Sequence, residues 1–268
     1  MIKIENTKVE GFEPAIRGMR NPKNSWGMSD SESILELSVD ESDSDVLYHM
    51  FQNFDDDDPN ADNYLKWSVK YGVNFKIGDK DEDLCLRLNA GGPVHAKYRR
   101  QIVVWCNITA PLYWWKEFDT YKVGTVANSC STMHKIHAKE FELSDFSTEH
   151  LIPMSDIVKP GEEAKLVLNE LPVMMIEDGN YWSPLGVLKM TIVMLNKCRK
   201  LYLDTKDKKY WWQLIQLLPT SYNQKRTVML NYEVLHNMYV SRKDHKLDEW
   251  HTLCDWIFEL PYSELIIT

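Results

Sequence analysis

The stretch QIVVWCNITAPLYWWKEFDTYKVGTVANSCSTMHK, residues 101–135, combines three different patterns. Residues 101–108 form a short apolar, β-branched run that is typical of a buried strand and ends before Pro111. Residues 112–118 follow as an aromatic turn of helix, and 119–135 then gathers lysines, hydroxyls, an amide and a thiol. A packed strand disfavours so many small polar groups. We therefore expect strand 101–108 to lead, within a single α+β domain, into a ligand-facing segment at 119–135.

The composition indicates a globular protein and restricts its partners. The chain has 268 residues, 44% of them hydrophobic and 26% charged, with a net charge of −9 from 31 Lys and Arg against 40 Asp and Glu. Binding to polymeric nucleic acid depends on neutralising phosphates, so this charge argues against nucleic acid as the main partner. No run of 18 apolar residues predicts a membrane span, and the first residues lack the pattern of a secretion signal. We expect a cytoplasmic protein.

The remaining elements are predicted by their periodicity. Residues 2–9 alternate like a strand, and a helix is expected to open at 13–20. Further helices are expected at four places: 185–203, 210–218, 232–242 and 247–260. In the last, an apolar stripe makes Cys254 a packing residue rather than a ligand. Two segments, 29–62 and 144–184, are interpreted as insertions in the one domain spanning 1–268, and the first of them is acidic.

Few residues of the sequence are spaced as metal ligands would be. The acidic run Asp55–Asp58 lacks the alternating ligands and glycine of a calcium loop, which favours a solvated surface. His134 and His137 form an HxxH pair without a third ligand in pattern, so a metal site and a plain polar pair stay open. His245 and His251 are too far apart to share a metal on one helical turn, and we expect them on the surface. The five cysteines contain no CxxC pair.

Cys130 is a candidate nucleophile. It lies between Ser129 and Ser131, and Lys122, Lys135 and His134 are near in sequence. A cationic neighbourhood lowers the pKa of a thiol, which is how reactive cysteines arise. The alternative is a small residue in a tight turn.

Arg242 and Asn231 form a second candidate pair. They are eleven positions apart, about three helical turns, and we expect them on nearly the same face of helix 232–242. The planar fork of Arg suits a phosphate or the carbonyl edge of a pyrimidine. The alternative is an ordinary helix-end charge that pairs with Asp244 or Glu249.

The order of these segments resembles the flavin-dependent thymidylate synthases. That family has a signature of the form Arg-His-Arg-x-x-Ser-x-Asn-Glu-x-Ser-x-Arg-Tyr, reached through a strand, an Ala-Pro pair and an aromatic turn. The stretch 101–118 is similar to that approach, and 120–133 falls where the signature stands. Later features are similar in kind and spacing: the Leu-Pro break at 217–219, then Asn231 and Arg242. The early segment AIRGMRNP, 15–22, also resembles the family, and the likeness covers about three-quarters of the chain.

The signature itself is altered. Without a gap, the Arg-His-Arg positions hold Thr120, Tyr121 and Lys122, and Asn128 stands for the Glu. With a one-residue gap, Asn128 keeps the Asn and Ser131 the second Ser. In both alignments the last Arg is replaced, by Thr132 or Met133, and Lys122 is the one cation left of the flavin-binding pair. Lys is a point charge rather than a fork.

The resemblance implies an enzyme that transfers a one-carbon unit to the uracil ring of a deoxynucleotide, dUMP or a related pyrimidine. FAD would supply hydride and methylenetetrahydrofolate the carbon, and a homotetramer would share its sites. By the same resemblance Arg242 is catalytic; Lys122, Asn128 and Asn231 contact flavin or phosphate; and four residues contact the nucleotide, namely Ser129, Cys130, Ser131 and Thr132. The lost arginines favour a second hypothesis, a nucleotide-binding or protein-interaction member of the fold without turnover.

Overall fold

A computed structural model describes residues 2–39, 69–152 and 183–268. The chain divides into two compact units: unit 1 is Met1–Val9 with Val104–Ile267, and unit 2 is Glu10–Val103 with Thr268. Both contain helices and strands, so the α+β class expected from the sequence is confirmed. That the chain behaves as one domain stays a prediction. The acidic run Asp55–Asp58 and most of the two expected insertions lie outside the described residues.

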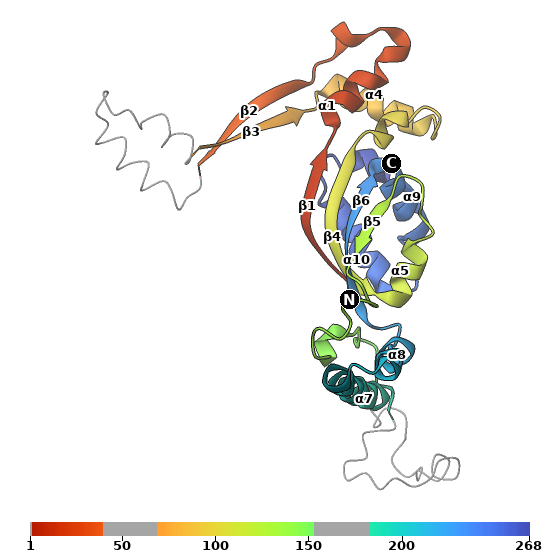
Figure 1. Ribbon diagram of the computed structural model, residues 1–268. Helices are drawn as coiled ribbons and strands as arrows, with labels where there is room; N and C mark the ends of the chain where they lie inside the picture. Colours follow the sequence, from red (N-terminus) through yellow and green to blue (C-terminus); the bar gives the residue numbers. More distant parts are fainter. Residues whose placement is uncertain (1, 40–68, 153–182) are drawn as a thin grey trace, which may run out of the picture. The chain divides into compact units, whose positions relative to one another are not determined.

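Unit 1 is built on a four-stranded sheet with the order β1-β4-β6-β5 (Figure 1). The strands are β1 (Lys3–Glu10), β4 (Val103–Pro111), β5 (Val126–Ser129) and β6 (Asn223–Asn231). In β4 the buried positions alternate through Val104, Cys106, Ile108 and Ala110, as in a strand with one face in the core. The expected strand at 101–108 is confirmed, although it begins at 103. The sequence analysis missed β6 and β5.

Unit 1 also contains three longer helices, and tryptophans join the first of them to the sheet and to the third. The three helices are α5 (Leu112–Phe118), α9 (Tyr232–Arg242) and α10 (Asp248–Phe258), and a short α11 (Glu264–Ile267) follows. Trp115 Nε1 of α5 donates a hydrogen bond to the Gln224 carbonyl of β6 at 3.0 Å. The rings of Trp114 and Trp250 lie 4.8 Å apart, which joins α5 to α10. These contacts fix the C-terminal end of α5 beside α10.

The predicted apolar stripe of α10 is confirmed with one exception. Trp250, Leu253, Cys254 and Ile257 are buried, but Phe258 is half exposed. Burial raises the pKa of the Cys254 thiol to about 11, so this cysteine stays protonated and packs as a small apolar residue.

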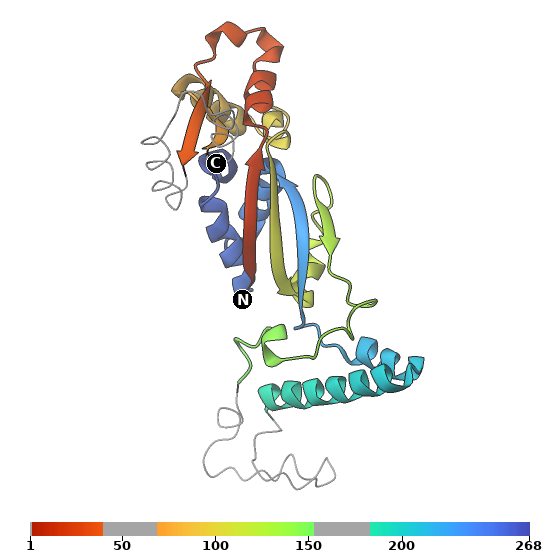
Figure 2. The same cartoon turned by 60° about the vertical axis from the view of Figure 1, so that its left-hand side comes forward.

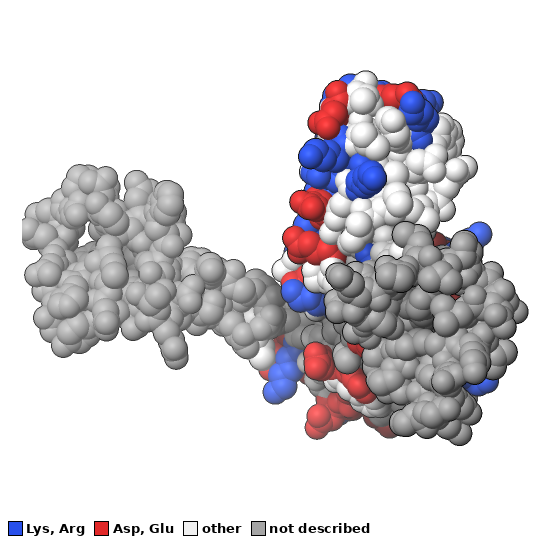
Figure 3. Space-filling view, turned by 90° about the horizontal axis from the view of Figure 1, so that it is seen from below, with Lys and Arg blue, Asp and Glu red and all other residues white. Residues whose placement is uncertain are grey.

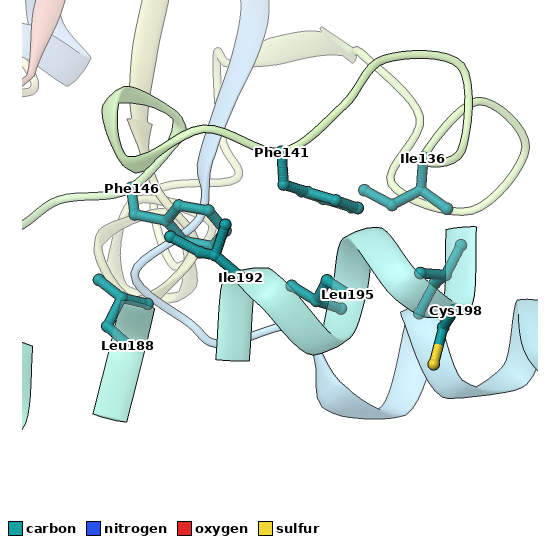
Figure 4. Packing of buried hydrophobic residues seen from close by; sticks show 8 residues of the cluster. Ile136, Phe141, Phe146, Leu188, Ile192, Leu195 and Cys198 are labelled. Atoms are coloured by element: carbon teal, nitrogen blue, oxygen red, sulfur yellow. The ribbon is translucent and has the colours of Figure 1, made fainter. Parts of the chain in front are cut away.

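The remaining part of unit 1 is a helical hairpin (Figure 2). It consists of α7 (Pro184–Thr205) and α8 (Lys208–Leu217), both predicted. The Ser183 side chain caps α7 by accepting from Gly186 N, and α8 ends just before Pro219. Figure 4 shows how α7 packs: Leu188, Ile192 and Leu195 meet side chains of the segment that follows β5, which are Ile136, Phe141 and Phe146.

Unit 2 contains α1 (Phe12–Met19), the antiparallel pair β2 (Glu32–Val39) and β3 (Val69–Lys76), and α4 (Asp79–Ala90). The predicted helix at 13–20 is thereby confirmed. Gly11, before α1, has φ of 100°, and a Cβ there would lie 2.2 Å from the Gln101 carbonyl oxygen. Only glycine fits such a position. No helix of the described ranges is long and apolar enough to cross a membrane.

One buried ion pair holds unit 2 together. Arg20 Nε donates to Asp81 Oδ1 at 2.5 Å, and the hydroxyls of Ser29 and Ser31 donate to Asp81 Oδ2 at 2.5 and 2.6 Å. Burial alone would raise the pKa of Asp81, but the bonds from Ser29, Ser31 and Arg20 outweigh it and lower the pKa. This carboxylate is therefore ionised in the folded protein.

Candidate functional site

Glu117, at the end of α5, is the centre of a polar cluster in unit 1. Its Oε2 accepts hydrogen bonds from Arg242 Nη1 at 2.8 Å and from Trp250 Nε1 at 3.0 Å, and His245 Nε2 lies 3.4 Å away. The side chain of Glu117 nevertheless keeps 35% of its surface exposed. The cluster brings together residues from α5, α9, α10 and the turn between the last two helices.

Arg242 is held by one carboxylate and two aromatic rings. Its Nε donates to the Tyr121 hydroxyl at 2.9 Å, and its guanidinium lies over the Trp250 ring with 4.7 Å between Cζ and the ring centroid. The side chain is 19% exposed, and Nη2 donates to no described residue. Arg242 thus lies beside the 119–135 stretch, with one face of its fork still open to a ligand.

The alternative of a helix-end pair with Asp244 or Glu249 is wrong in its partner. Glu249 is buried and accepts a very short hydrogen bond from the Tyr113 hydroxyl. The ion pair of Arg242 is instead with Glu117, 125 positions away in the sequence. Glu117 was missed because only the fold brings α5 to the end of α9.

A second arginine, Arg226, was also missed. It lies in β6 directly opposite Ser129 of β5. Its Nη1 donates to Asp119 Oδ1 at 2.7 Å, and its Cζ is 4.1 Å from the centroid of the Trp115 ring. Arg226 and Arg242 therefore make the same two kinds of contact: each pairs with an acidic residue at the end of α5, and each stacks on a tryptophan. The sequence gives only a weak strand signal there, because polar residues interrupt the apolar alternation of β6.

The stretch 119–135 contains the edge strand β5 and is largely exposed. Asn128 and Ser129 lie in β5, whose four residues are all exposed, and Cys130 and Ser131 continue it at the surface. Thr132 is half-buried. Cys130 is fixed by its backbone: its N–H donates to the Lys225 carbonyl at 2.9 Å, and its carbonyl accepts from Gln224 Nε2 at 2.7 Å. The Ser131 hydroxyl accepts from His134 N at 2.9 Å, so this serine shapes a turn.

The expected cationic surroundings of Cys130 are not formed by direct contacts. No hydrogen bond or ion pair of the described chain joins Cys130 to Lys122, Lys135 or His134. Its role as a nucleophile stays a prediction.

The expectation that Asn231 shares a helix face with Arg242 is wrong. Asn231 ends β6 and is the N-cap of α9, where its Oδ1 accepts from Val234 N at 2.9 Å. A capping residue lies before the first helical turn, so the helical spacing to Arg242 does not apply. Its amide does reach the stretch: a Cβ on Gly124 (φ +77°) would lie 2.5 Å from Asn231 Nδ2. The Asn231 side chain therefore packs against the turn that follows Lys122.

Two groups in this turn remain available to an anion. Lys122 is exposed and forms no ion pair with a described residue. Thr125 Oγ1 is buried and has no hydrogen-bond partner among the described residues. Lys122 and Thr125 are three positions apart in the sequence, and an ammonium and a hydroxyl are both donors that a phosphate can use.

The described residues contain no group of three or more side chains placed to hold a metal ion. His137 packs edge-on against Tyr202, with ring centroids 5.0 Å apart, and His134 is exposed. Of the two histidines that the sequence predicted at the surface, His251 is exposed and His245 approaches Glu117. The HxxH pair is therefore not part of a metal cluster in the described ranges.

Unit 2 adds two cavities lined by the early segment AIRGMRNP, of about 1090 Å³ and about 830 Å³. Arg17 and the exposed Trp26 border the larger. The smaller combines apolar Met19 and Leu84 with three lysines, Lys23, Lys80 and Lys97. Both cavities of unit 2 thus have cationic side chains in their walls, which no single sequence motif predicted.

Comparison with solved structures identifies the architecture. A structure of thymidylate synthase X from Helicobacter pylori with FAD and dUMP matches over 100% of this chain and 98% of its own, with a TM-score of 0.53 and 15% identity. A second structure of that enzyme, also complexed with FAD and dUMP, matches over 99% and 98%, with a TM-score of 0.52 and 15% identity. The chain has the fold of a flavin-dependent thymidylate synthase. The resemblance stated from the sequence is thus confirmed at the level of the fold.

No family model and no curated protein matches the sequence. The thymidylate synthase fold is therefore visible in the backbone, while the 15% identity leaves the chemistry of individual residues to be argued from this chain alone.

Proposed function

We propose that the chain binds a pyrimidine deoxynucleotide, dUMP or a related compound, beside Arg242. The observation that carries this proposal is the partly open guanidinium of Arg242: its Nη2 has no partner among the described residues, and the Trp250 and Tyr121 rings lie beside it. An arginine fork matches the carbonyl edge of a pyrimidine or a phosphate, and the neighbouring rings exclude water from one side. The fold, shared with an enzyme solved with dUMP, supports the same class of ligand.

The first candidate for the reaction is the transfer of a one-carbon unit to the uracil ring. Arg242 would then act as an electrostatic catalyst that stabilises negative charge developing on the pyrimidine. Four hydroxyl- and thiol-bearing residues at the end of β5 and just after it would contact the nucleotide: Ser129, Cys130, Ser131 and Thr132. Lys122, Asn128 and the amide of Asn231 would contact flavin or phosphate, and the unpaired Thr125 hydroxyl is a further donor there.

FAD is the cofactor we propose, with methylenetetrahydrofolate as the carbon donor. When bound, the flavin supplies the hydride, and the chain's own residues hold and orient it. We also propose a homotetramer in the cytoplasm, with no nucleic acid polymer or membrane as partner. The exposed β5 edge fits a site completed by another subunit, because an unpaired edge strand is a ready surface for association.

The second candidate is a nucleotide-binding protein without turnover. Glu117 favours it, because this carboxylate already neutralises Arg242 at 2.8 Å and would weaken its stabilisation of a developing anion. The replacement of the signature arginines by Thr120 and Thr132 favours it as well.

Three measurements on the purified full-length protein separate these candidates. The enzyme hypothesis predicts a bound flavin spectrum or saturable binding of added FAD, calorimetric binding of dUMP, and formation of dTMP with methylenetetrahydrofolate and a reductant. Binding of dUMP without flavin binding and without dTMP would establish the binding protein. If neither dUMP nor FAD binds, the proposed function is wrong.

A further inference from the structure

Helix α7 has two apolar faces, and the described residues cover only one of them. The inner face packs in the cluster of Leu188, Ile192 and Leu195. The outer face carries four large apolar side chains that remain exposed: Val187 at 53%, Met190 at 43%, Val193 at 68% and Met194 at 49%. Protein surfaces normally expose large apolar side chains singly, whereas here four of them are exposed on one helix.

The exposed residues follow a regular spacing. Val187, Met190 and Met194 are separated by three and four positions. That spacing places them in one line along the helix, as in helices that pack against another apolar segment. Helix α8 adds two exposed side chains to the hairpin surface, Trp212 at 45% and Leu217 at 40%. We call the exposed apolar residues of α7 and α8 the outer face.

The outer face lies in a positively charged environment. Residues 183–218 contain seven Lys and Arg against two Asp, in a chain whose net charge is −9. Lys189, Lys197 and Lys200 are exposed, and helical spacing places them along one side of the apolar stripe. Figure 3 views the hairpin from its outer side and shows uncharged surface with Lys and Arg along its borders, among a few acidic groups. The matching partner is an apolar segment flanked by acidic residues.

The chain contains such a segment. Residues 40–62, DESDSDVLYHMFQNFDDDDPNAD, have nine acidic residues and no Lys or Arg. Their apolar and aromatic side chains are concentrated in 46–54, with acidic runs on both sides. Segment 153–182 is a poorer match, because it carries Lys159 and Lys165. It also starts from the opposite side of α7, where Leu151 packs against the inner cluster.

The place of residues 40–62 in unit 2 suits contact with another molecule. Val39 and Val69 are register partners, so residues 40–68 connect β2 and β3 at the end of their two-stranded ribbon. The ribbon runs outward from α1 and α4 of its own unit (Figure 1). Val39 and Val69, the described residues that flank the segment, therefore lie at the end of the ribbon.

We propose that the outer face of α7 and α8 is a docking site for residues 40–62 of a second copy of this chain. The apolar residues 46–54 cover the stripe from Val187 to Met194, and the flanking acidic runs meet Lys189, Lys197 and Lys200. Burial of apolar area provides the affinity, and the opposite charges orient the approach. Because the face and the segment are different surfaces, the contact is head-to-tail. This inference does not depend on the proposed function.

The test uses a fluorescent peptide of residues 40–62 and a full-length variant whose own segment is silenced by Leu47→Ser, Phe51→Ser and Phe54→Ser. Fluorescence anisotropy should show saturable binding that weakens at high salt. Adding Val193→Glu to the variant should weaken binding at least about tenfold, since a charge would be buried in the apolar contact. Val240→Glu, at a valine of α9 that is 56% exposed, is the matched control and should leave binding unchanged.

A complementation experiment tests whether the contact forms between copies. Full-length Val193→Glu keeps its segment but loses the face, and the silenced variant keeps the face but loses its segment. The mixture should associate more tightly, by sedimentation, than either protein alone. The proposal is wrong if the peptide does not bind, or if it binds the Val193→Glu protein as tightly as the protein without that change. It is also wrong if a peptide with Leu47→Ser, Phe51→Ser and Phe54→Ser, which keeps all nine acidic residues, binds as tightly as the natural peptide. Failure of the mixed variants to associate would contradict it as well. Binding that requires removal of 153–182 would assign the face to that segment instead.

Discussion

Two arginine–carboxylate pairs, one in each unit, differ in how far they are closed. In unit 2, Arg20 and Asp81 are 5% and 0% exposed, and the hydroxyls of Ser29 and Ser31 complete the Asp81 carboxylate. In unit 1, Arg242 and Glu117 are 19% and 35% exposed, and Arg242 Nη2 has no described partner. The first pair is almost completely buried, although Arg20 also lines the two cavities of unit 2. The second pair keeps a donor, Arg242 Nη2, that has no described partner and can bind a ligand.

An arginine–carboxylate pair alone does not mark a binding site. A closed pair contributes to folding, because its charges cannot find water once a partner is removed. An open pair contributes less to folding and can exchange its partner for a ligand anion. Each pair therefore makes opposite predictions for stability and for binding.

The largest effect is expected at the closed pair. Asp81→Asn should lower the free energy of unfolding by about 3–5 kcal/mol, because it leaves the Arg20 charge buried without a counter-charge. Urea denaturation measures the loss. The control is Asp83→Asn in the same helix, whose pair with Arg87 is exposed at 66% and 67% and should contribute a few tenths of a kcal/mol at most. Equal effects of the two substitutions would show that burial does not distinguish the pairs.

The stabilising effect of Asp81 should depend on pH. Its pKa is lowered in the folded protein, so the ionised form stabilises the fold above the unfolded-state pKa of about 3.9. The contribution should disappear as the pH falls through the lowered folded-state value. Urea denaturation from pH 7 down to pH 2 should therefore show the difference between wild type and Asp81→Asn shrinking below about pH 4. A difference that grows in acid would mean that the pKa shift has the opposite sign.

A smaller, opposite effect is expected at the open pair. Glu117→Gln keeps the shape of the side chain but removes the charge that competes for Arg242. The affinity for dUMP should rise about three- to tenfold, because a nucleotide anion no longer meets the carboxylate. Calorimetric titration measures it, with the exposed Glu259→Gln as control. A fall in affinity would place Glu117 among the ligand's own contacts.

The smallest effect is expected from Tyr121→Phe. This change removes the hydroxyl that accepts from Arg242 Nε and keeps the aromatic ring. Since one hydrogen bond contributes about 0.5–1.5 kcal/mol, the affinity for dUMP should change by no more than about tenfold. A larger loss, measured by the same titration, would show that the hydroxyl itself contacts the nucleotide.

Much of the fold could be predicted because its signals are local. The helices α7, α9 and α10 and the strand β4 follow from apolar periodicity, which depends on a residue's nearest neighbours in sequence. β6 was missed because Gln224 and Arg226 interrupt its apolar alternation, and both are polar for tertiary reasons: one fixes Cys130 and the other stacks on Trp115. β5 is too short and too exposed to give a strand signal.

The site was only partly predictable. Arg242 and the 119–135 stretch were found through their order along the chain, and the fold does bring Tyr121 to Arg242. Glu117 and Arg226 could not be found in this way, because their roles depend on contacts more than 100 positions apart. The helical spacing proposed for Asn231 and Arg242 failed at a boundary, where a strand ends and a cap begins.

The most direct test of the account measures binding and stability together for Arg242→Ala, with wild type as reference. The account predicts that affinity for dUMP falls about ten- to a hundredfold, since a charge-assisted hydrogen bond contributes about 1.5–3 kcal/mol. The free energy of unfolding should change by no more than about 1 kcal/mol, because the pair with Glu117 is partly exposed. Unchanged affinity together with a loss of stability of about 3 kcal/mol or more would show that Arg242 is a structural arginine like Arg20.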